Sequence, residues 1–196
     1  MSATKKGLCF FLACVLLSAL LGGTVLAGQE EGKELDLFAT SAVLLDGESG
    51  RVLYQKNGRE PMANASTTKI LTCILILEEC GTEETATVSG YAARMPKVKL
   101  NVNRGEQYRV VDLLYSLMLE SHNDSAVVLA EHAGKKWLPE VRDKDPGEFT
   151  EEESRLVLKA FSKKMNEKAA EIGCQDTYFI TPNGLDATET VSMPDG

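Results

Sequence analysis

The chain has 196 residues, 43% of them hydrophobic, and a formal net charge of -8. This length suffices for one domain with a buried core and is short for two large ones. The acidic balance does not favour nucleic-acid binding, which needs clustered Lys and Arg against phosphate. The sequence also contains no Gly-rich phosphate loop and no Cys or His cluster at zinc spacing.

The first residues have the pattern of an export signal. Lys5 and Lys6 precede an almost wholly apolar run, and small residues suited to cleavage end at Ala27. We therefore predict a signal peptide over residues 1–27, a flexible lead-in over 28–40, and an exported protein, secreted or held at the cell envelope. The apolar run is nearly long enough to span a bilayer, so an uncleaved anchor is the competing interpretation.

The next predicted elements are a hairpin, a buried helix and short strands. Apolar runs at 41–45 and 51–55 flank a Gly-rich turn, which indicates two paired strands. Residues 69–80 have a helical pattern that is apolar on nearly every side, so we expect a helix buried all round. We expect short strands at 85–89 and, from alternating polar and apolar residues, at 97–102.

Helices dominate the second half of the chain. An apolar stripe predicts a helix over 111–120, followed by a break and a second helix from about 124 to 132. Thr150 and Glu153 form a capping box for a long third helix. The expected inner face of that helix consists of Phe161, Met165, Ala169 and Ile172. A brief strand at 177–180 then returns toward the hairpin, and this order of elements predicts an α+β fold.

Three cysteines would remain after cleavage of the signal: Cys73, Cys80 and Cys174. An odd number argues against a complete disulfide framework. Cys73 and Cys80 lie seven apart on one predicted helix, about 10 Å along its axis, which is too far for a bridge. We expect all three to be small apolar residues packed in a core.

Ser66 and Lys69 are the first candidates for chemistry. Three residues apart at the start of a helix, their side chains share one face. The free N–H groups of a helix N-terminus favour negative charge near Ser66, and burial lowers the pKa of a lysine. A neutral Lys69 could therefore take the hydroxyl proton of Ser66 and make it a nucleophile. The alternatives are coincidence, since Ser2 and Lys5 have the same spacing, and a lysine that snorkels to water.

Ser121 and Asn123 are the second candidates, at the break between two predicted helices. A serine there could relay a proton between the lysine and a leaving group, and the asparagine amide could hold a substrate carbonyl. The alternative is a helix cap, because Ser, Asn and Asp are the preferred capping residues.

Ser-x-x-Lys followed by Ser-x-Asn resembles two of the three signature motifs of penicillin-binding proteins and class A β-lactamases. The surrounding sequence is similar to that of the D-alanyl-D-alanine carboxypeptidases in four blocks, which keep their order over about residues 40 to 190. These blocks are Ser41 to Tyr54, Pro61 to Lys69, Val111 to Ala126, and Phe161 to Asp186. The resemblance implies a penicillin-binding protein/β-lactamase-like transpeptidase fold, with a partial catalytic domain at 41–196.

The resemblance also implies roles for the candidate residues. Ser66 would attack the carbonyl between the two terminal D-alanines of a peptidoglycan stem peptide, with Lys69 as the base. Ser121 would pass the proton to the departing D-alanine, and Asn123 would hold the peptide and the lysine. Penicillins and other β-lactam antibiotics would be trapped at the same serine. The resemblance implies no metal and no cofactor.

The sequence departs from the family in two places. His122 occupies the variable middle position of Ser-x-Asn, where we expect a mild effect. The third motif, Lys-Thr-Gly or Lys-Ser-Gly, is absent from the chain, which ends at Gly196. Its strand would supply the second donor of the oxyanion hole, and losing one such donor costs about 10² to 10³ in rate. We therefore expect an incomplete catalytic domain that also lacks the C-terminal, membrane-associating segment common in the family.

We also consider two other functions. A class A β-lactamase-like hydrolase needs a Glu-x-x-x-Asn loop, but the 148–153 region leads into a capped helix and Asn166 falls in the wrong register. A non-catalytic remnant that binds the cell wall is favoured by the absent third motif. The intact Ser66, Lys69, Ser121 and Asn123 count against that remnant.

Overall fold

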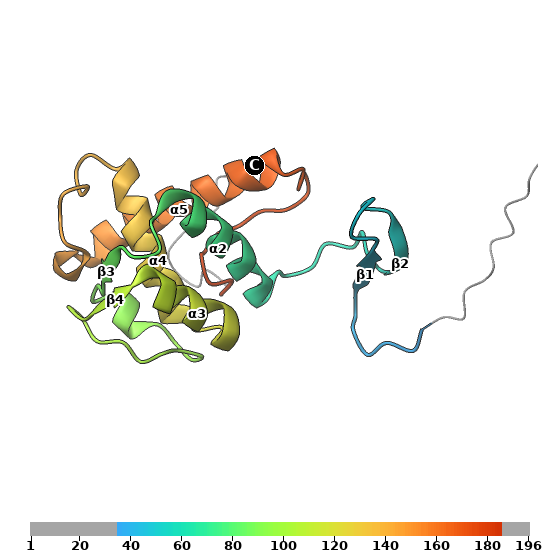
Figure 1. The fold of residues 1–196 in the computed structure, drawn as a ribbon, viewed down its shortest axis with the longest axis horizontal. Coiled ribbons are helices and arrows are strands. Elements are labelled where there is room, and N and C mark those ends of the chain that lie inside the picture. Colours follow the sequence, from blue (N-terminus) through green and yellow to red (C-terminus); the bar gives the residue numbers. More distant parts are fainter. Residues whose placement is uncertain (1–34, 186–196) are drawn as a thin grey trace, which may run out of the picture. The chain divides into compact units, whose positions relative to one another are not determined.

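The computed structural model describes residues 35–185, so the predicted signal peptide lies outside the described residues. The described chain divides into two compact units between Glu60 and Pro61, and each is considered by itself (Figure 1). Within 35–185 the strands form two separate two-stranded sheets, and the helices belong to the larger unit. Strands and helices are thus both present, as the predicted α+β fold requires.

The smaller unit contains the predicted hairpin. Strands β1 (Ala42–Leu45) and β2 (Val52–Lys56) pair antiparallel, and the register shifts by one residue near the turn. The Asp46 carboxylate accepts a hydrogen bond from the backbone N–H of Ser49 at 2.8 Å, and Gly50 closes the turn with a φ of +68°. About half of each apolar side chain of the hairpin is exposed: Val43, Leu44, Leu45, Val52 and Leu53.

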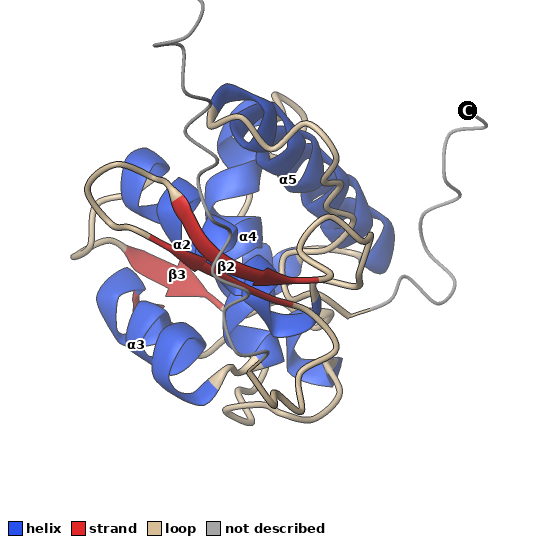
Figure 2. Cartoon of the chain, turned by 90° about the vertical axis from the view of Figure 1, so that its right-hand side faces the viewer, coloured by secondary structure: helices blue, strands red, loops and turns tan. Residues whose placement is uncertain are grey.

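The larger unit is mainly helical. Its helices are α2 (Thr68–Glu79), α3 (Val110–Glu120), α4 (Asn123–Gly134) and α5 (Glu151–Glu171), and its strands are β3 (Thr85–Thr87) and β4 (Gln107–Arg109). Short 3₁₀ turns lie at η1 (Ala65–Thr67), η2 (Ala92–Arg94), η3 (Lys135–Trp137) and η4 (Pro146–Glu148). Helix α4 is buried over its whole length, and the other helices gather around it (Figure 2). The core therefore forms around α4.

The predicted helices are confirmed, with one correction to the burial of α2. Leu71, Leu75 and Ile76 are buried against the core, but Ile70 and Leu77 are each 54% exposed. Helix α2 is therefore not buried on every side. The all-apolar pattern indicates which residues can be buried, and not which of them find a neighbour.

The predicted strand at 97–102 is wrong: the structure has an irregular loop there, with bends at 97–98 and a φ of +68° at Asn101. The backbone N–H groups of Leu100, Asn101 and Val102 donate to the carboxylate of Asp124, at 2.9, 2.9 and 3.3 Å. A side chain therefore takes the donors that a partner strand would have taken. The strand that pairs with β3 is instead β4, which the sequence analysis did not predict.

The predicted strand at 177–180 is wrong for a similar reason. The Asn166 side chain on α5 accepts from the backbone N–H of Phe179 at 2.8 Å and donates to its carbonyl at 2.8 Å. The Ser162 hydroxyl donates to the same carbonyl at 2.6 Å. Two helix side chains thus occupy the backbone groups that would form a ladder, and the segment is held against α5 as a loop.

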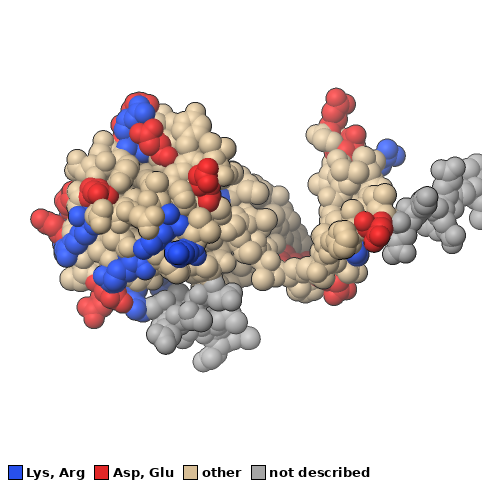
Figure 3. Space-filling model, turned by 90° about the horizontal axis from the view of Figure 1, so that it is seen from below, with Lys and Arg blue, Asp and Glu red and all other residues tan. Residues whose placement is uncertain are grey.

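Helix α5 begins as predicted, since the Thr150 and Glu153 capping box is present. One residue of the predicted inner face is wrong: Ile172 lies just beyond the helix end and is 55% exposed. The three cysteines are unpaired as expected, but only Cys80 is buried and Cys174 is exposed. None of the helices within residues 35–185 is both long enough and apolar enough to cross a membrane. On the face drawn in Figure 3, basic side chains of the larger unit lie among acidic ones.

Candidate active site

Ser66 and Lys69 lie where the 3₁₀ turn η1 passes into α2. Ser66 is exposed to solvent, whereas Lys69, in the first turn of α2, has only 2% of its surface exposed. The ammonium nitrogen Lys69 Nζ lies 3.0 Å from Ser66 Oγ. The spacing of three residues therefore places the two side chains in hydrogen-bond contact, as the sequence predicted.

Lys69 Nζ has two further partners, and together they suit a base. It donates to Asn123 Oδ1 at 3.0 Å and to the backbone carbonyl of Asn183 at 2.8 Å. Both of these atoms can only accept, so they occupy both N–H bonds of a neutral amine. The lone pair of that amine then faces the Ser66 hydroxyl, which can donate to it. When the proton moves from Oγ to Nζ, all three contacts persist, with Nζ now donating to each.

The electrostatic environment of Lys69 favours the neutral amine. Burial lowers the pKa of Lys69, and the three atoms that contact Nζ belong to a hydroxyl, a side-chain amide and a peptide group. None of the three carries a charge that would restore the ammonium form. The site therefore holds a lysine that gives up its proton more readily than a lysine in water.

Asn123 is positioned by the break between α3 and α4. Ser121 ends α3 with a φ of +60°, and Asn123 is the first residue of α4. Asn123 donates from its backbone N–H to the Val98 carbonyl at 2.8 Å and from Nδ2 to the Pro96 carbonyl at 3.3 Å. The amide nitrogen is thus directed to the 96–102 loop, which leaves Oδ1 toward Lys69.

The Asn183 carbonyl reaches Lys69 through a turn that is pinned to α2. The Thr72 hydroxyl donates to the Pro182 carbonyl at 2.7 Å, one helical turn beyond Lys69. Gly184 has a φ of +77°, and a Cβ placed on it would lie 1.8 Å from the carbonyl oxygen of Ala65. Only glycine allows this approach, so the turn packs directly on the backbone that precedes the nucleophile.

The structure brings together three of the four predicted residues. Ser66, Lys69 and Asn123 form one hydrogen-bonded group, whereas the half-buried Ser121 makes no hydrogen bond to either Ser66 or Lys69. The predicted relay role of Ser121 therefore stays a prediction. The His122 side chain contacts α3 instead, where its Nδ1 lies 2.7 Å from Ser116 Oγ.

The sequence does not indicate the Asn183 carbonyl as a partner of Lys69. A backbone acceptor has no residue signature, so the Pro-Asn-Gly sequence could indicate a turn there but not its partner. The available signal was Gly184, since a glycine directly after Asn183 permits a close backbone approach.

Comparison with known proteins shows which family this chain belongs to. A family model described as D-alanyl-D-alanine carboxypeptidase matches residues 28–136. Over 185 residues the chain is 35% identical to the D-alanyl-D-alanine carboxypeptidase DacF of Bacillus subtilis, an alignment that covers 87% of this chain and 42% of that protein. The chain thus spans about two fifths of the length of this relative.

Solved structures resemble the chain in the same way. The D-alanyl-D-alanine carboxypeptidase DacD of Francisella tularensis matches with a TM-score of 0.66 and 26% identity, over 81% of this chain and 34% of that one. Penicillin-binding protein D2 of Listeria monocytogenes, solved in its ampicillin-bound form, matches with a TM-score of 0.59 and 26% identity. That match covers 80% of this chain and 56% of the Listeria chain.

Proposed function

Because the chain belongs to the D-alanyl-D-alanine carboxypeptidase family, we propose that the protein removes the terminal D-alanine of peptidoglycan stem peptides through an acyl-enzyme on Ser66. We also propose that penicillins and other β-lactams acylate the same serine. The solved relative with bound ampicillin supports the second statement. The family match and the contacts of Lys69 support the first.

The proposed acylation begins with the neutral amine of Lys69. The Ser66 oxygen attacks the carbonyl carbon between the two D-alanines while its proton moves to Nζ, 3.0 Å away. The negative charge that develops on the carbonyl oxygen faces the N-terminus of α2, where free N–H groups stabilise an anion. The carbon–nitrogen bond then breaks, and the departing D-alanine amine takes the proton from Lys69.

Water completes the proposed cycle. It attacks the ester carbonyl, gives one proton back to the Ser66 oxygen, and releases the shortened peptide with a free carboxylate. In this scheme Ser121 relays the proton between Lys69 and the amine, and the Asn123 amide holds the peptide. The position of Ser121, two residues before Asn123 at a left-handed break, supports a place near the reacting groups.

One observation carries the proposal: both N–H bonds of a neutral Lys69 are taken by pure acceptors, and its third contact is Ser66. A lysine that only snorkelled would extend its amine to water. Lys69 is 2% exposed as a residue, and its amine has hydrogen-bond partners inside the protein. We further propose that the protein is exported and acts on the cell wall, on the basis of the signal-like residues 1–27.

The test is covalent labelling of the protein, at its full natural length, with a fluorescent penicillin. We expect the wild type to be labelled and Ser66→Ala to remain unlabelled although folded. Ser49→Ala, which removes a serine on the hairpin turn of the smaller unit, should label as the wild type does. A folded wild type that takes no label contradicts the proposal.

Release of the label distinguishes the alternatives. A carboxypeptidase holds the penicilloyl group for a long time and frees D-alanine from a peptide ending in D-Ala-D-Ala. A β-lactamase-like enzyme would release the label quickly and leave that peptide intact. A non-catalytic protein would do neither.

A further inference from the structure

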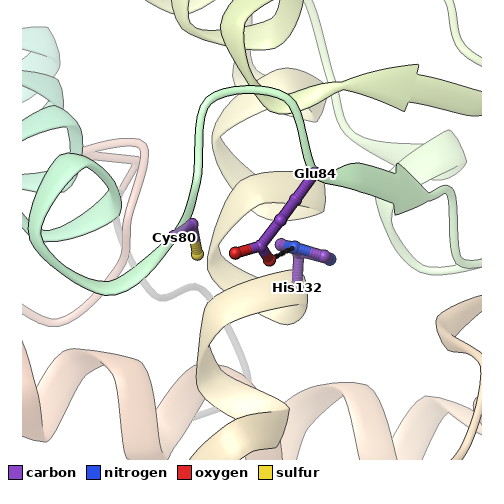
Figure 4. Close-up of side chains that lie close together, drawn as sticks. All are labelled: Cys80, Glu84 and His132. Atoms are coloured by element: carbon purple, nitrogen blue, oxygen red, sulfur yellow. Dashed lines mark hydrogen bonds and ion pairs between the residues drawn. The ribbon is translucent and has the colours of Figure 1, made fainter.

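A second group of reactive side chains lies at the other end of α2. Cys80 directly follows the helix, Glu84 stands in the loop before β3, and His132 lies on α4 (Figure 4). One ligand atom from each residue, a sulfur, a carboxylate oxygen and an imidazole nitrogen, lies within 4.8 Å of the others. Of these atoms, His132 Nε2 and Glu84 Oε2 lie 2.8 Å apart.

These three atoms are a donor set for a borderline-soft divalent cation. Thiolate, imidazole and carboxylate are the ligands that Zn²⁺ uses, and around one tetrahedral ion they lie roughly 3.5 Å apart. Cys80 and His132 are buried on the side of the core, whereas the Glu84 side chain is 40% exposed. The buried pair gives the group rigidity, and the exposed carboxylate gives an ion a way in.

The amine of Lys136 marks where a cation is stabilised. Its Nζ lies 3.0 Å from Glu84 Oε2, 3.5 Å from Cys80 Sγ and 2.9 Å from the Glu79 carbonyl at the end of α2. A single positive charge therefore already contacts two of the three donors and a helix C-terminal carbonyl. The Lys136 side chain is 34% exposed, so it can turn to solvent when another cation arrives.

We propose that Cys80, Glu84 and His132 form a zinc site, with water as the fourth ligand and Lys136 as the cation that zinc displaces. Binding makes one Zn–S, one Zn–O and one Zn–N bond. The Cys80 thiol loses its proton to solvent, and the ammonium of Lys136 moves out with its charge unchanged. The two negative charges of thiolate and carboxylate then balance the two positive charges of the ion.

The position of the site indicates its effect. Helices α2 and α4 are joined at their beginnings by the bond from Lys69 to Asn123 and at their ends by this group. From Lys69 to Cys80 the distance along α2 is about 16 Å. Zinc at the far end would fix the pair of helices that carries Lys69 and Asn123, without contacting the reacting atoms. The site therefore stabilises the fold, and its existence does not depend on catalysis at Ser66.

The test titrates the full chain with Co²⁺ and then Zn²⁺. We expect one equivalent of Co²⁺ to bind with a thiolate-to-cobalt charge-transfer band, Zn²⁺ to displace it, and Zn²⁺ to raise the melting temperature. Cys80→Ser should lose the band, and His132→Ala should weaken binding by about tenfold or more. Because Cys80 packs in the core, circular dichroism of each variant checks that it is folded. Glu84→Gln is a second variant that lacks one ligand, and it keeps the size and shape of the side chain.

Lysine variants make the test sharper. Lys136→Met removes the competing cation and should bind Zn²⁺ at least about tenfold more tightly. Lys135→Met is the matched control, since the Lys135 amine contacts the Lys144 carbonyl and not the cluster. Cys73→Ser is the control for Cys80→Ser, because it removes a thiol that is not one of the three ligands. The proposal is overturned if neither the wild type nor Lys136→Met binds one equivalent, or if the band persists in Cys80→Ser.

Discussion

The two ends of the α2–α4 pair each hold a lysine, and the two lysines differ in their surroundings. At the beginning of the pair, burial lowers the pKa of Lys69, whose partners are uncharged. At its end, burial alone would lower the pKa of Lys136, but its hydrogen bonds and charge interactions with Glu84 and Cys80 outweigh burial and raise that pKa.

This difference shows what makes a lysine a base. Burial acts on both amines, but within residues 35–185 only Lys136 has a carboxylate beside it, at 3.0 Å. A carboxylate retains the proton on the amine, whereas amide and hydroxyl oxygens satisfy its hydrogen bonds without adding charge. The same helix pair therefore supports a base at one end and a cation site at the other.

The largest expected effect comes from removing the base itself. In Lys69→Met the Ser66 hydroxyl loses its proton acceptor, so we expect the rate of acylation by penicillin to fall about 10³-fold. Stopped-flow or time-resolved labelling measures this rate. Lys135→Met, which removes a lysine charge outside both groups, should change it less than twofold. Equal losses in the two variants would show that charge, and not the base, controls the rate.

The next effect concerns the turn that contacts Lys69. In Gly184→Ala the new Cβ would lie 1.8 Å from the Ala65 carbonyl oxygen, so the turn must move and Lys69 loses the Asn183 acceptor. We expect acylation to slow about 10²-fold, because small misplacements of reacting groups are costly. Gly173→Ala is the control: Gly173 also has a positive φ, of +91°, but open space around it. An acylation rate that falls equally in both variants would assign the effect to backbone strain alone.

A third variant tests whether a carboxylate beside Lys69 raises its pKa, as Glu84 and Cys80 raise the pKa of Lys136. Asn123→Asp places a carboxylate beside Lys69 and should raise its pKa. Acylation needs the neutral amine, so its rate rises with pH through the pKa of Lys69. In the wild type that rise should be centred below the ordinary value of 10.5. In the variant it should move to higher pH, with a loss of about tenfold near neutrality.

The control for this pH profile is Asn103→Asp, which adds the same charge at an exposed position. Its profile should match that of the wild type. If Asn123→Asp leaves the midpoint of the profile unchanged, Lys69 is not the group that titrates.

The last expected effect is on stability and not on the rate of acylation. Asp124 is fully buried and accepts hydrogen bonds from three backbone N–H groups of the 100–102 loop. Asp124→Asn removes the charge that strengthens these bonds and should lower the free energy of unfolding by about 2 kcal/mol. Asp112→Asn, which removes an exposed charge that pairs with Arg109 in the first turn of α3, should cost less than about 1 kcal/mol in urea unfolding. Equal losses of unfolding free energy in the two variants would contradict the role of Asp124 in holding this loop.

Local signals predicted much of this architecture. The capping box of Thr150 and Glu153 and the apolar stripe before Ser121 each depend on residues a few positions apart, and both helices formed where expected. The strands at 97–102 and 177–180 failed because their backbone groups bind Asp124 and Asn166, which are distant in sequence. Alternation of polar and apolar residues does not reveal such partners.

The same distinction holds for the two sites. Ser66 and Lys69 are neighbours on one turn, so their spacing predicted their contact. The Asn183 carbonyl contacts Lys69 across 114 residues and has no side-chain signature. Cys80, Glu84 and His132 follow no metal-binding spacing, and only the packing of α4 against the end of α2 brings His132 to the other two.

The most direct measurement locates the covalent bond. The full-length protein is incubated with penicillin, digested, and its peptides are sequenced by mass spectrometry. We predict a single penicilloyl adduct on the Ser66 side chain, present in the wild type and in Ser49→Ala. An adduct on another residue, or an unmodified Ser66 peptide from a folded protein at saturating penicillin, would contradict the assignment of Ser66 as the nucleophile and Lys69 as its base.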